Sequence, residues 1–301
     1  MRIVHRVIAS LPDSEAIAKK FLPRWSGILV MDGKVVRVYD ALATKLDRTK
    51  FSDDELRWMH KMRWLCGVDY GTGDLPHYVL ADTESRIDLI LYFQTLKSFN
   101  YRLVALVCDG NPEIPYAAKF VFGDVVVVQR CTRHFLEDLR ALLPSARDDA
   151  KARAMLEGII LLVKRVIEAD TIEEAASAET RLIDAVRRSR NIRAQQMFTM
   201  YLAAKIELTA HLTHPELHLP HTSNDIESLF KQLMLRLKSL GRFFHHRYAN
   251  DYLNAWALLR RFTPFTDCCT SRRGRNGKAP LQIAGCEING IDPFTLRKQE
   301  P

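Results

Sequence analysis

The chain has 301 residues, of which 47% are hydrophobic and 27% are charged, and its formal net charge is +8. This composition is typical of a folded globular protein and excludes a disordered tail. The sequence has no run of eighteen apolar residues, and its N-terminus lacks the apolar run and cleavage site of a secretory signal. We therefore expect a cytoplasmic protein without a membrane span. Six scattered cysteines do not suggest a disulfide scaffold.

The positive charge is concentrated near the C-terminus. Residues 228–301 contain 13 Lys or Arg and 5 Asp or Glu, whereas charges of the two signs balance in residues 1–227. A basic segment of this kind favours a polyanionic partner such as DNA, because neutralising phosphates supplies most of the non-specific affinity for nucleic acid. A solvated basic surface without a partner is the alternative interpretation.

Residues 28–42 predict a β-hairpin. Two apolar runs flank an Asp-Gly dipeptide, which is typical of tight turns and would place Asp32 at the turn. A third strand is expected over residues 77–81. Residues 84–99 have the spacing of an amphipathic helix, which would cross to a buried strand at residues 103–108, parallel to the third strand.

The next segment continues the alternation of helices and strands. A short helix is expected over residues 114–120 and a buried strand over residues 124–129, which completes the order three strands, helix, strand, helix, strand. Residues 133–213 contain one glycine and one proline and repeat apolar positions at helical spacing, which predicts a helical insertion. Two more helices are expected, one opening around Asn224 and one over residues 251–262.

Three acidic residues stand where the expected elements begin or end. Asp32 lies at the expected turn, Asp109 directly follows a buried strand, and Glu227 lies in the first turn of a helix. Carboxylates gathered in this way would supply the oxygen ligands that Mg²⁺ prefers, and without cations they would repel one another. Each acid also has a local alternative: a hairpin turn for Asp32, a loop for Asp109, and a capping box with Asn224 for Glu227.

These acids resemble the Asp-Asp-Glu catalytic core of Mutator-like transposases, which belong to the RNase H-like integrase superfamily. The resemblance rests on Asp32, Asp109 and Glu227 in this order, on Cys131-x2-His134 between the last two, and on the helix sequence S-N-D-I-E-S-L-F-K-Q-L. It implies an α/β fold in which an all-helical insertion interrupts an RNase H-like mixed-sheet core between the second catalytic Asp and the catalytic Glu.

The resemblance covers the chain from about residue 28 to about residue 281 and implies a division into parts. These are an N-terminal leader (1–26), the first part of the core (27–138), the helical insertion (139–218), the second part of the core with the Glu helix and the helix after it (219–265), and a basic C-terminal tail (266–301). Mutator-like transposases usually carry a DNA-binding region before their first catalytic Asp, whereas 31 residues precede it here. The resemblance therefore leaves open how the ends of the element are recognised.

The activity that the resemblance implies is DNA transposition, with strand cleavage at the element ends and transfer of the 3′-hydroxyl into target DNA. Two Mg²⁺ or Mn²⁺ ions held by Asp32, Asp109 and Glu227 would serve the attacking and leaving oxygens. The implied partners are double-stranded DNA and further copies of the chain, in a homodimer or larger synaptic complex at the nucleoid. A non-catalytic DNA-binding remnant and an RNase H-like nuclease without strand transfer are the alternatives.

Four basic residues near Glu227 are candidates for contacts with the DNA backbone. Apolar positions in this helix recur at steps of four and three, which places Glu227, Lys231 and Lys238 together on the adjacent face. Arg236 and Arg242 are two further candidates, each equally compatible with an ordinary surface position.

The Cys131-x2-His134 motif has the spacing of half a zinc site. The missing half could come from the histidine-rich segment before the Glu helix, which contains His211, His214, His218 and His221, and the candidate ligands are His211 and His214. A zinc ion bound there would fasten the helical insertion to the core. A buried cysteine beside a hydrogen-bonded histidine is the alternative.

Three other acids compete with the proposed catalytic set. Asp69 is the strongest competitor because it too follows a short apolar segment, and Asp74 and Asp124 lie near expected strands. None of the three is included in the predicted site.

Overall fold

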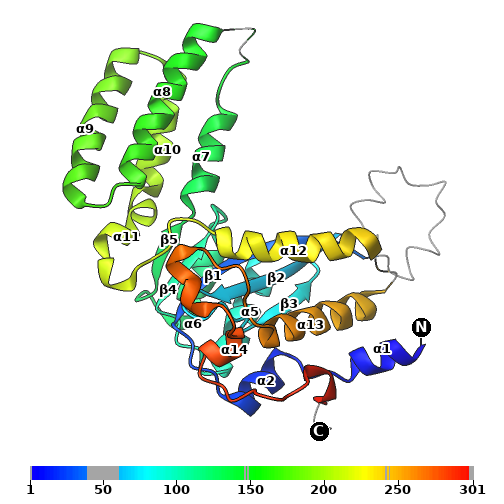
Figure 1. The fold of residues 1–301 in the computed structure, drawn as a ribbon. Coiled ribbons are helices and arrows are strands. Elements are labelled where there is room, and N and C mark those ends of the chain that lie inside the picture. Colours follow the sequence, from blue (N-terminus) through cyan, green and yellow to red (C-terminus); the bar gives the residue numbers. More distant parts are fainter. Residues whose placement is uncertain are drawn as a thin grey trace, which may run out of the picture. The chain divides into compact units, whose positions relative to one another are not determined.

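The computed structural model describes residues 2–38, 61–145, 147, 149–240, 243 and 245–297 (Figure 1). The fold is α/β, as expected, with a mixed five-stranded sheet in the order β3-β2-β1-β4-β5. The strands are β1 (Ile28–Arg37), β2 (Lys61–Asp69), β3 (Tyr78–Ala81), β4 (Ala105–Cys108) and β5 (Val127–Arg130).

Helices make up most of the remaining described chain. They are α1 (Arg2–Ala9), α2 (Ser14–Phe21), α5 (Arg86–Ser98), α6 (Glu113–Phe122), α7 (Thr132–Ala141), α8 (Ala150–Ile167), α9 (Ile172–Ser189), α10 (Ile192–Leu208), α11 (Ala210–Thr213), α12 (Asn224–Leu240), α13 (His246–Phe262) and α14 (Pro280–Ile283), with 3-10 turns at Pro215–Leu217, Thr270–Arg275 and Pro293–Thr295.

The predicted hairpin at residues 28–42 is wrong. The chain runs through Asp32 without turning, and β1 is one strand that pairs antiparallel with β2, Asp32 opposite Cys66. An Asp-Gly dipeptide forms a turn only where the flanking segments pair with each other. Here both flanks pair with β2 instead, so a distant partner overrides the local turn signal. Residues 39–42 lie outside the described residues.

The two strands of the predicted hairpin are the single strand β1, and the second strand of the structure, β2, was not predicted. From β3 onward the expected order of strand, helix, strand, helix, strand is confirmed. The expected pairing of the third strand with the fourth is wrong, because β3 pairs antiparallel with β2 and is not a neighbour of β4, which pairs in parallel with β5. The helix between β3 and β4 is α5, which begins where Ser85 and Asp88 form a capping box.

Contacts within the chain divide it into two compact units. Unit 1 comprises residues 1–104, 116–125 and 224–301, and unit 2 comprises residues 105–115 and 126–223. Unit 1 therefore contains β1, β2, β3 and the helices α12 and α13, whereas unit 2 contains β4, β5 and the helices from α7 to α11.

The core of unit 1 includes a cluster of aromatic rings between its strands and α12 and α13. Trp64 of β2 is 1% exposed, and its ring centroid lies 5.9 Å from that of Phe230 in α12 and 5.8 Å from that of Trp256 in α13. The predicted apolar stripe of α12 is confirmed at Ile226, Phe230, Leu233 and Leu237, all of which are buried. This stripe fixes which side of α12 faces the sheet.

Unit 1 also contains a buried ion pair. Nε and Nη2 of Arg261 donate to the two carboxylate oxygens of Asp74, each at 2.8 Å, and both side chains are 0% exposed. Nε1 of Trp25 donates to the same carboxylate at 2.8 Å. A buried charge is tolerated only when it is paired and hydrogen-bonded, and Asp74 meets both conditions.

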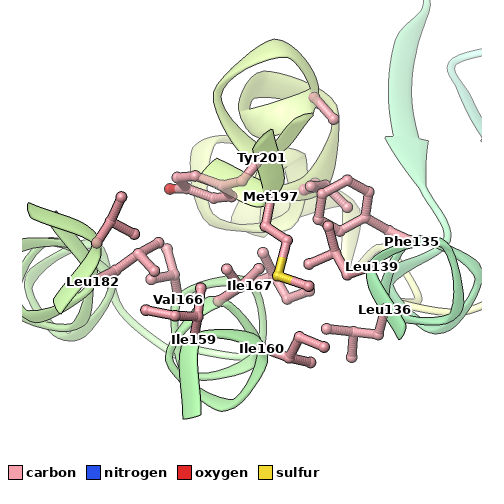
Figure 2. Close-up of a cluster of buried hydrophobic side chains, with 14 of the residues drawn as sticks. Phe135, Leu136, Leu139, Ile159, Ile160, Val166, Ile167, Leu182, Met197 and Tyr201 are labelled. Atoms are coloured by element: carbon pink, nitrogen blue, oxygen red, sulfur yellow. The ribbon is translucent and has the colours of Figure 1, made fainter. Parts of the chain in front are cut away.

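Unit 2 is held together by an apolar core that its four long helices share. Figure 2 shows Phe135, Leu136 and Leu139 of α7 directed toward side chains of α8 and α10. Leu182 of α9 packs into the same cluster. The predicted helical nature of this region is confirmed, and Thr171 caps α9 by accepting a hydrogen bond from the backbone N–H of Glu174.

None of the helices in the described part of the chain combines the length and the apolar character needed to cross a membrane.

Candidate functional site

Asp32 lies in the middle of β1 on a half-buried position. Side chains alternate between the faces of a strand, so Asp32 and Lys34 point to the same face. Nζ of Lys34 lies 5.9 Å from the centroid of the Phe230 ring in α12. Asp32 therefore faces the side of the sheet that α12 covers, and the interpretation of Asp32 as a turn residue is wrong.

Glu227 lies in the first turn of α12 and is half-buried. The helix already includes Asn224, so the residue before it is Ser223, and Asn224 does not stand at the capping position that the alternative required. α12 packs against β1. Asp32 and Glu227 thus belong to two elements of unit 1 that are in contact.

A basic groove runs between β1 and α12. It has a volume of about 650 Å³, and its described lining includes the cationic side chains of Lys34, Arg37, Lys231 and Lys238. Val35, Val36, Met234, Leu235, Leu237 and Phe243 complete the lining. None of the lining residues that the structure describes is acidic, so the groove concentrates positive charge beside the elements that carry Asp32 and Glu227.

The structure separates the predicted DNA-binding residues from one another. Lys231 and Lys238 line the basic groove, whereas Arg236 lines a different, largely apolar hollow between α12 and α13. Arg242 lies outside the described residues. The sequence interpretation missed Lys34 and Arg37, which the period-2 alternation from Asp32 would have indicated had β1 been recognised as one strand.

Two of the three acids that competed with the predicted set have structural roles in unit 1, whereas Asp124 is exposed. Asp69 is fully buried and accepts hydrogen bonds from Ser26, Thr72 and the Tyr101 hydroxyl. Asp74 is occupied by its buried ion pair. Carboxylates saturated in this way have little capacity left for a ligand.

Unit 2 brings Asp109 and Cys131 to one edge of its parallel strand pair. β4 and β5 are in register with Cys108 opposite Arg130, so the residues that follow are Asp109 and Cys131. The backbone N–H of Cys131 donates to the carbonyl of Cys108 at 2.7 Å. The carboxyl ends of parallel strands are where open α/β sheets bind ligands, which makes this edge a candidate site.

Asp109 shapes the loop that leaves β4. It is half-buried, and its Oδ1 accepts a hydrogen bond from the backbone of Asn111 at 2.9 Å. This is the local bond expected of an aspartate in a turn, and it occupies one carboxylate oxygen.

The thiol of Cys131 lies at the start of α7 in a polar setting. Its sulfur accepts hydrogen bonds from the backbone N–H and the hydroxyl of Ser223, at 3.4 and 3.3 Å. Burial acts to raise the pKa of this thiol, but hydrogen bonds from His134 and Ser223 outweigh it and lower the pKa to about 7. A thiol that loses its proton this readily is suited to bind a soft metal ion such as zinc.

The two histidines predicted to complete a zinc site make other contacts. The ring of His211 lies 3.8 Å from that of His221, centroid to centroid, and its backbone N–H donates to Gln129. His214 lies 3.4 Å from Glu216. Among the described residues of unit 2, no three Cys, His, Asp or Glu ligand atoms all lie within 4.8 Å of one another. The four-residue zinc site therefore stays a prediction.

A scan against protein-family models found no match to this chain, and a search of curated proteins found none either.

Proposed function

We propose that this protein is a DNA transposase with an RNase H-like core, in which Asp32, Asp109 and Glu227 together form a metal-dependent site. The observation that carries the proposal is the pairing of acids and cations on β1 and α12. Each element presents one carboxylate followed by two cationic side chains that line the basic groove, Lys34 and Arg37 on β1, Lys231 and Lys238 on α12.

The donor set fits a hard divalent cation. All three side chains offer carboxylate oxygens, which Mg²⁺ and Mn²⁺ prefer, and all three are half-buried, whereas Asp69 is fully buried. A pair of such ions would stabilise the charge that develops on the attacking and leaving oxygens of a phosphodiester.

The chain's own residues would do the positioning. Lys231 and Lys238 would hold the backbone of the cleaved strand, and Lys34 and Arg37 would hold it from the opposite wall of the groove, because ammonium and guanidinium groups bind phosphate oxygens. Asp109, at the carboxyl end of β4, would complete the acidic set. The order of strands and helices is the one that the resemblance to Mutator-like transposases implies.

The proposal also assigns partners. Double-stranded DNA of the element ends and the target would occupy the groove, and two or more copies of the chain would be needed to hold two ends at once. Cys131 and His134 would supply two ligands to a structural zinc, with His211 and His214 as the predicted others.

Nicking of supercoiled plasmid tests the enzymatic claim without knowledge of the element ends. We expect Mn²⁺-dependent nicking by the wild type and at least about 100-fold slower nicking by Asp32→Asn, Asp109→Asn and Glu227→Gln. The matched control is Asp124→Asn, which changes an exposed acid and should nick at the wild-type rate.

A second assay separates a transposase from a nuclease of the same fold. An oligonucleotide duplex with a free 3′-hydroxyl is added, and joined products are sought by gel electrophoresis. Joining supports the transposase, whereas nicking without joining supports the nuclease. DNA binding without nicking or joining supports the non-catalytic remnant.

Zinc content is a separate test of the Cys131 and His134 assignment. Elemental analysis of the purified protein should give about one zinc per chain, lowered in Cys131→Ala and His134→Ala. A folded, metal-free wild type would remove zinc from the proposal and leave the acidic site untouched.

A further inference from the structure

The C-terminal part of unit 1 forms another hollow, smaller than the basic groove, that the proposed catalytic site does not use. Its volume is about 460 Å³. The lining comes from the N-terminal half of α12, from Arg260 in α13 and from the loop after α13, and it includes Arg272 and Arg275. We call this hollow the arginine pocket.

The loop that forms one wall is held by specific bonds. The backbone N–H of Phe265 donates to the carbonyl of Lys278 at 3.1 Å, and that of Cys268 donates to Oδ1 of Asn276 at 3.0 Å. The ring of Phe265 lies where a side chain on Gly73 would be, 2.7 Å from the position of its Cβ. Hydrogen bonds and side-chain packing therefore hold the wall of the pocket in place.

The three arginines are held in different ways. Arg272 is paired with Asp225 at 2.6 Å and lies over the Tyr70 ring, 4.5 Å from its centroid. Arg275 donates to the backbone carbonyl of Tyr70 at 2.8 Å. These contacts fix the two guanidinium groups in the wall of the pocket without neutralising Arg275.

The positive charge of Arg260 has the fewest polar partners of the three arginines. Its guanidinium carbon lies 4.5 Å from the centroid of the Phe265 ring, and within the described part of the chain it makes no hydrogen bond or ion pair. Burial lowers the pKa of Arg260, and burial together with the neighbouring Arg272 charge lowers that of Arg275. Positive charge in the pocket thus exceeds what its two acids, Asp225 and Asp267, balance.

We propose that the arginine pocket binds a phosphate oxyanion between Arg260 and Arg275. Guanidinium groups present paired N–H donors that match two oxygens of a phosphate, and a partly desolvated pocket strengthens such bonds. The hydroxyl group of Ser228 belongs to the same lining and adds a donor, whereas the hydroxyls of Thr263 and Thr266 already donate to the carbonyl of Leu259 and to Asp267. The oxyanion is a free phosphate, or a phosphate of a nucleic-acid backbone. Binding here does not require that the protein cleave DNA.

Two cysteines lie in the lining, so the rate at which they are alkylated depends on whether a ligand occupies the pocket. Cys268 is half-buried and Cys269 is exposed, whereas Cys66, Cys108, Cys131 and Cys286 are buried. Alkylation of Cys269 in the full chain, followed by mass spectrometry of its peptide, therefore measures access to the pocket.

The experiment compares an anionic and a neutral alkylating reagent. Each forms a sulfur–carbon bond at the thiolate and releases iodide. Relative to a free thiol such as glutathione, we expect iodoacetate to be favoured over iodoacetamide at Cys269 severalfold, because the arginines attract its carboxylate. Inorganic phosphate should remove this preference and slow both reagents.

Variants that remove the same charge at two positions test whether phosphate protection depends on Arg260 itself. Arg260→Gln should raise the phosphate concentration for half-protection about tenfold, since it removes a charge-assisted bond, and Arg260→Lys should lie between it and the wild type. Arg273→Gln removes an equal charge from an exposed residue of the same loop that does not line the pocket, and it should behave as the wild type. Circular dichroism checks that each variant is folded.

The probes also distinguish the two sources of phosphate. Protection by a 20-base-pair duplex at far lower concentration than inorganic phosphate assigns the pocket to nucleic acid, and protection by inorganic phosphate alone assigns it to a small ligand. If neither probe protects Cys269, or if Arg260→Gln and Arg273→Gln respond alike, the oxyanion site is refuted. That result would leave the proposed catalytic site standing, because none of its residues lines this pocket.

Discussion

The Asp74–Arg261 pair shows how much of unit 1 depends on single buried groups. Both side chains are completely buried, and the only charge on each is balanced by the other. The bonds from Arg261 and Trp25 explain why this acid is kept in the interior although it has no place in the proposed site.

We predict that Asp74→Asn lowers the free energy of unfolding by about 3–5 kcal/mol, because it leaves the Arg261 charge buried without its partner. Urea denaturation measures the loss. The exposed Asp124→Asn serves as control and should change stability by less than about 0.5 kcal/mol. A loss in Asp74→Asn no larger than the control would show that the pair does not matter to folding.

His77 is a second buried group with a measurable consequence. Its Nδ1 lies 2.9 Å from the hydroxyl of Ser14, and its ring packs against Tyr92 and Phe99. Burial lowers the pKa of His77 to about 4 from an ordinary value near 6.5. Unfolding restores the ordinary pKa. Between about pH 4 and pH 6.5, His77 is therefore protonated in the unfolded state and neutral in the folded state.

Stability should therefore fall as the pH is lowered from about 6.5 to about 4. The contribution of His77 to this fall is on the order of 3 kcal/mol, the free energy that corresponds to a shift of this size. In His77→Gln the fall should be smaller by that amount, measured by urea denaturation across this pH range, whereas the exposed His246→Gln should keep the wild-type profile. Identical profiles in wild type and His77→Gln would contradict the assignment.

At the scale of elements, α12 and β1 act as the two walls of the basic groove. α12 turns Ile226, Phe230 and Leu233 toward the sheet and leaves Lys231 exposed beside it. Lys34 reaches the same groove from β1. The groove thus depends on both the helical spacing of the lysines in α12 and the alternation of side chains along β1. No single segment of the sequence encodes it.

We predict that Lys34→Gln and Lys231→Gln each weaken DNA binding and reduce the slope of log affinity against log salt by about 0.9, because each removes one phosphate contact. Fluorescence anisotropy with a labelled duplex at several salt concentrations measures both quantities. Lys151→Gln changes an exposed lysine of α8 and should leave the slope unaltered. A slope unchanged in Lys34→Gln would exclude β1 from the DNA contact.

At the scale of the whole molecule, the sequence predicted what depends on local pattern. The order of elements from β3 to β5, the apolar stripe of α12 and the helical nature of the region after Cys131 followed from periodicity, whereas β2 was not predicted. The predicted hairpin failed because the partner of β1 is β2, a segment more than twenty residues away, and local turn preference carries no information about it.

The candidate site was predictable to a similar extent. Asp32, Asp109 and Glu227 could be selected from the sequence because each stands out against an apolar element. Lys34 could not, since its position depends on β1 being one continuous strand. The arginine pocket was also beyond prediction, because it forms when a C-terminal loop returns to Tyr70.

The central claim is that three carboxylates distant in sequence bind divalent metal together, and calorimetric titration with Mn²⁺ tests it without any DNA. We expect the wild type to bind Mn²⁺ and Asp32→Asn, Asp109→Asn and Glu227→Gln each to lose most of that binding, because a shared site fails when any of its ligands is neutralised. Asp124→Asn should bind as the wild type does. Equal binding by the wild type and all three variants, or no binding by the wild type, would contradict the claim.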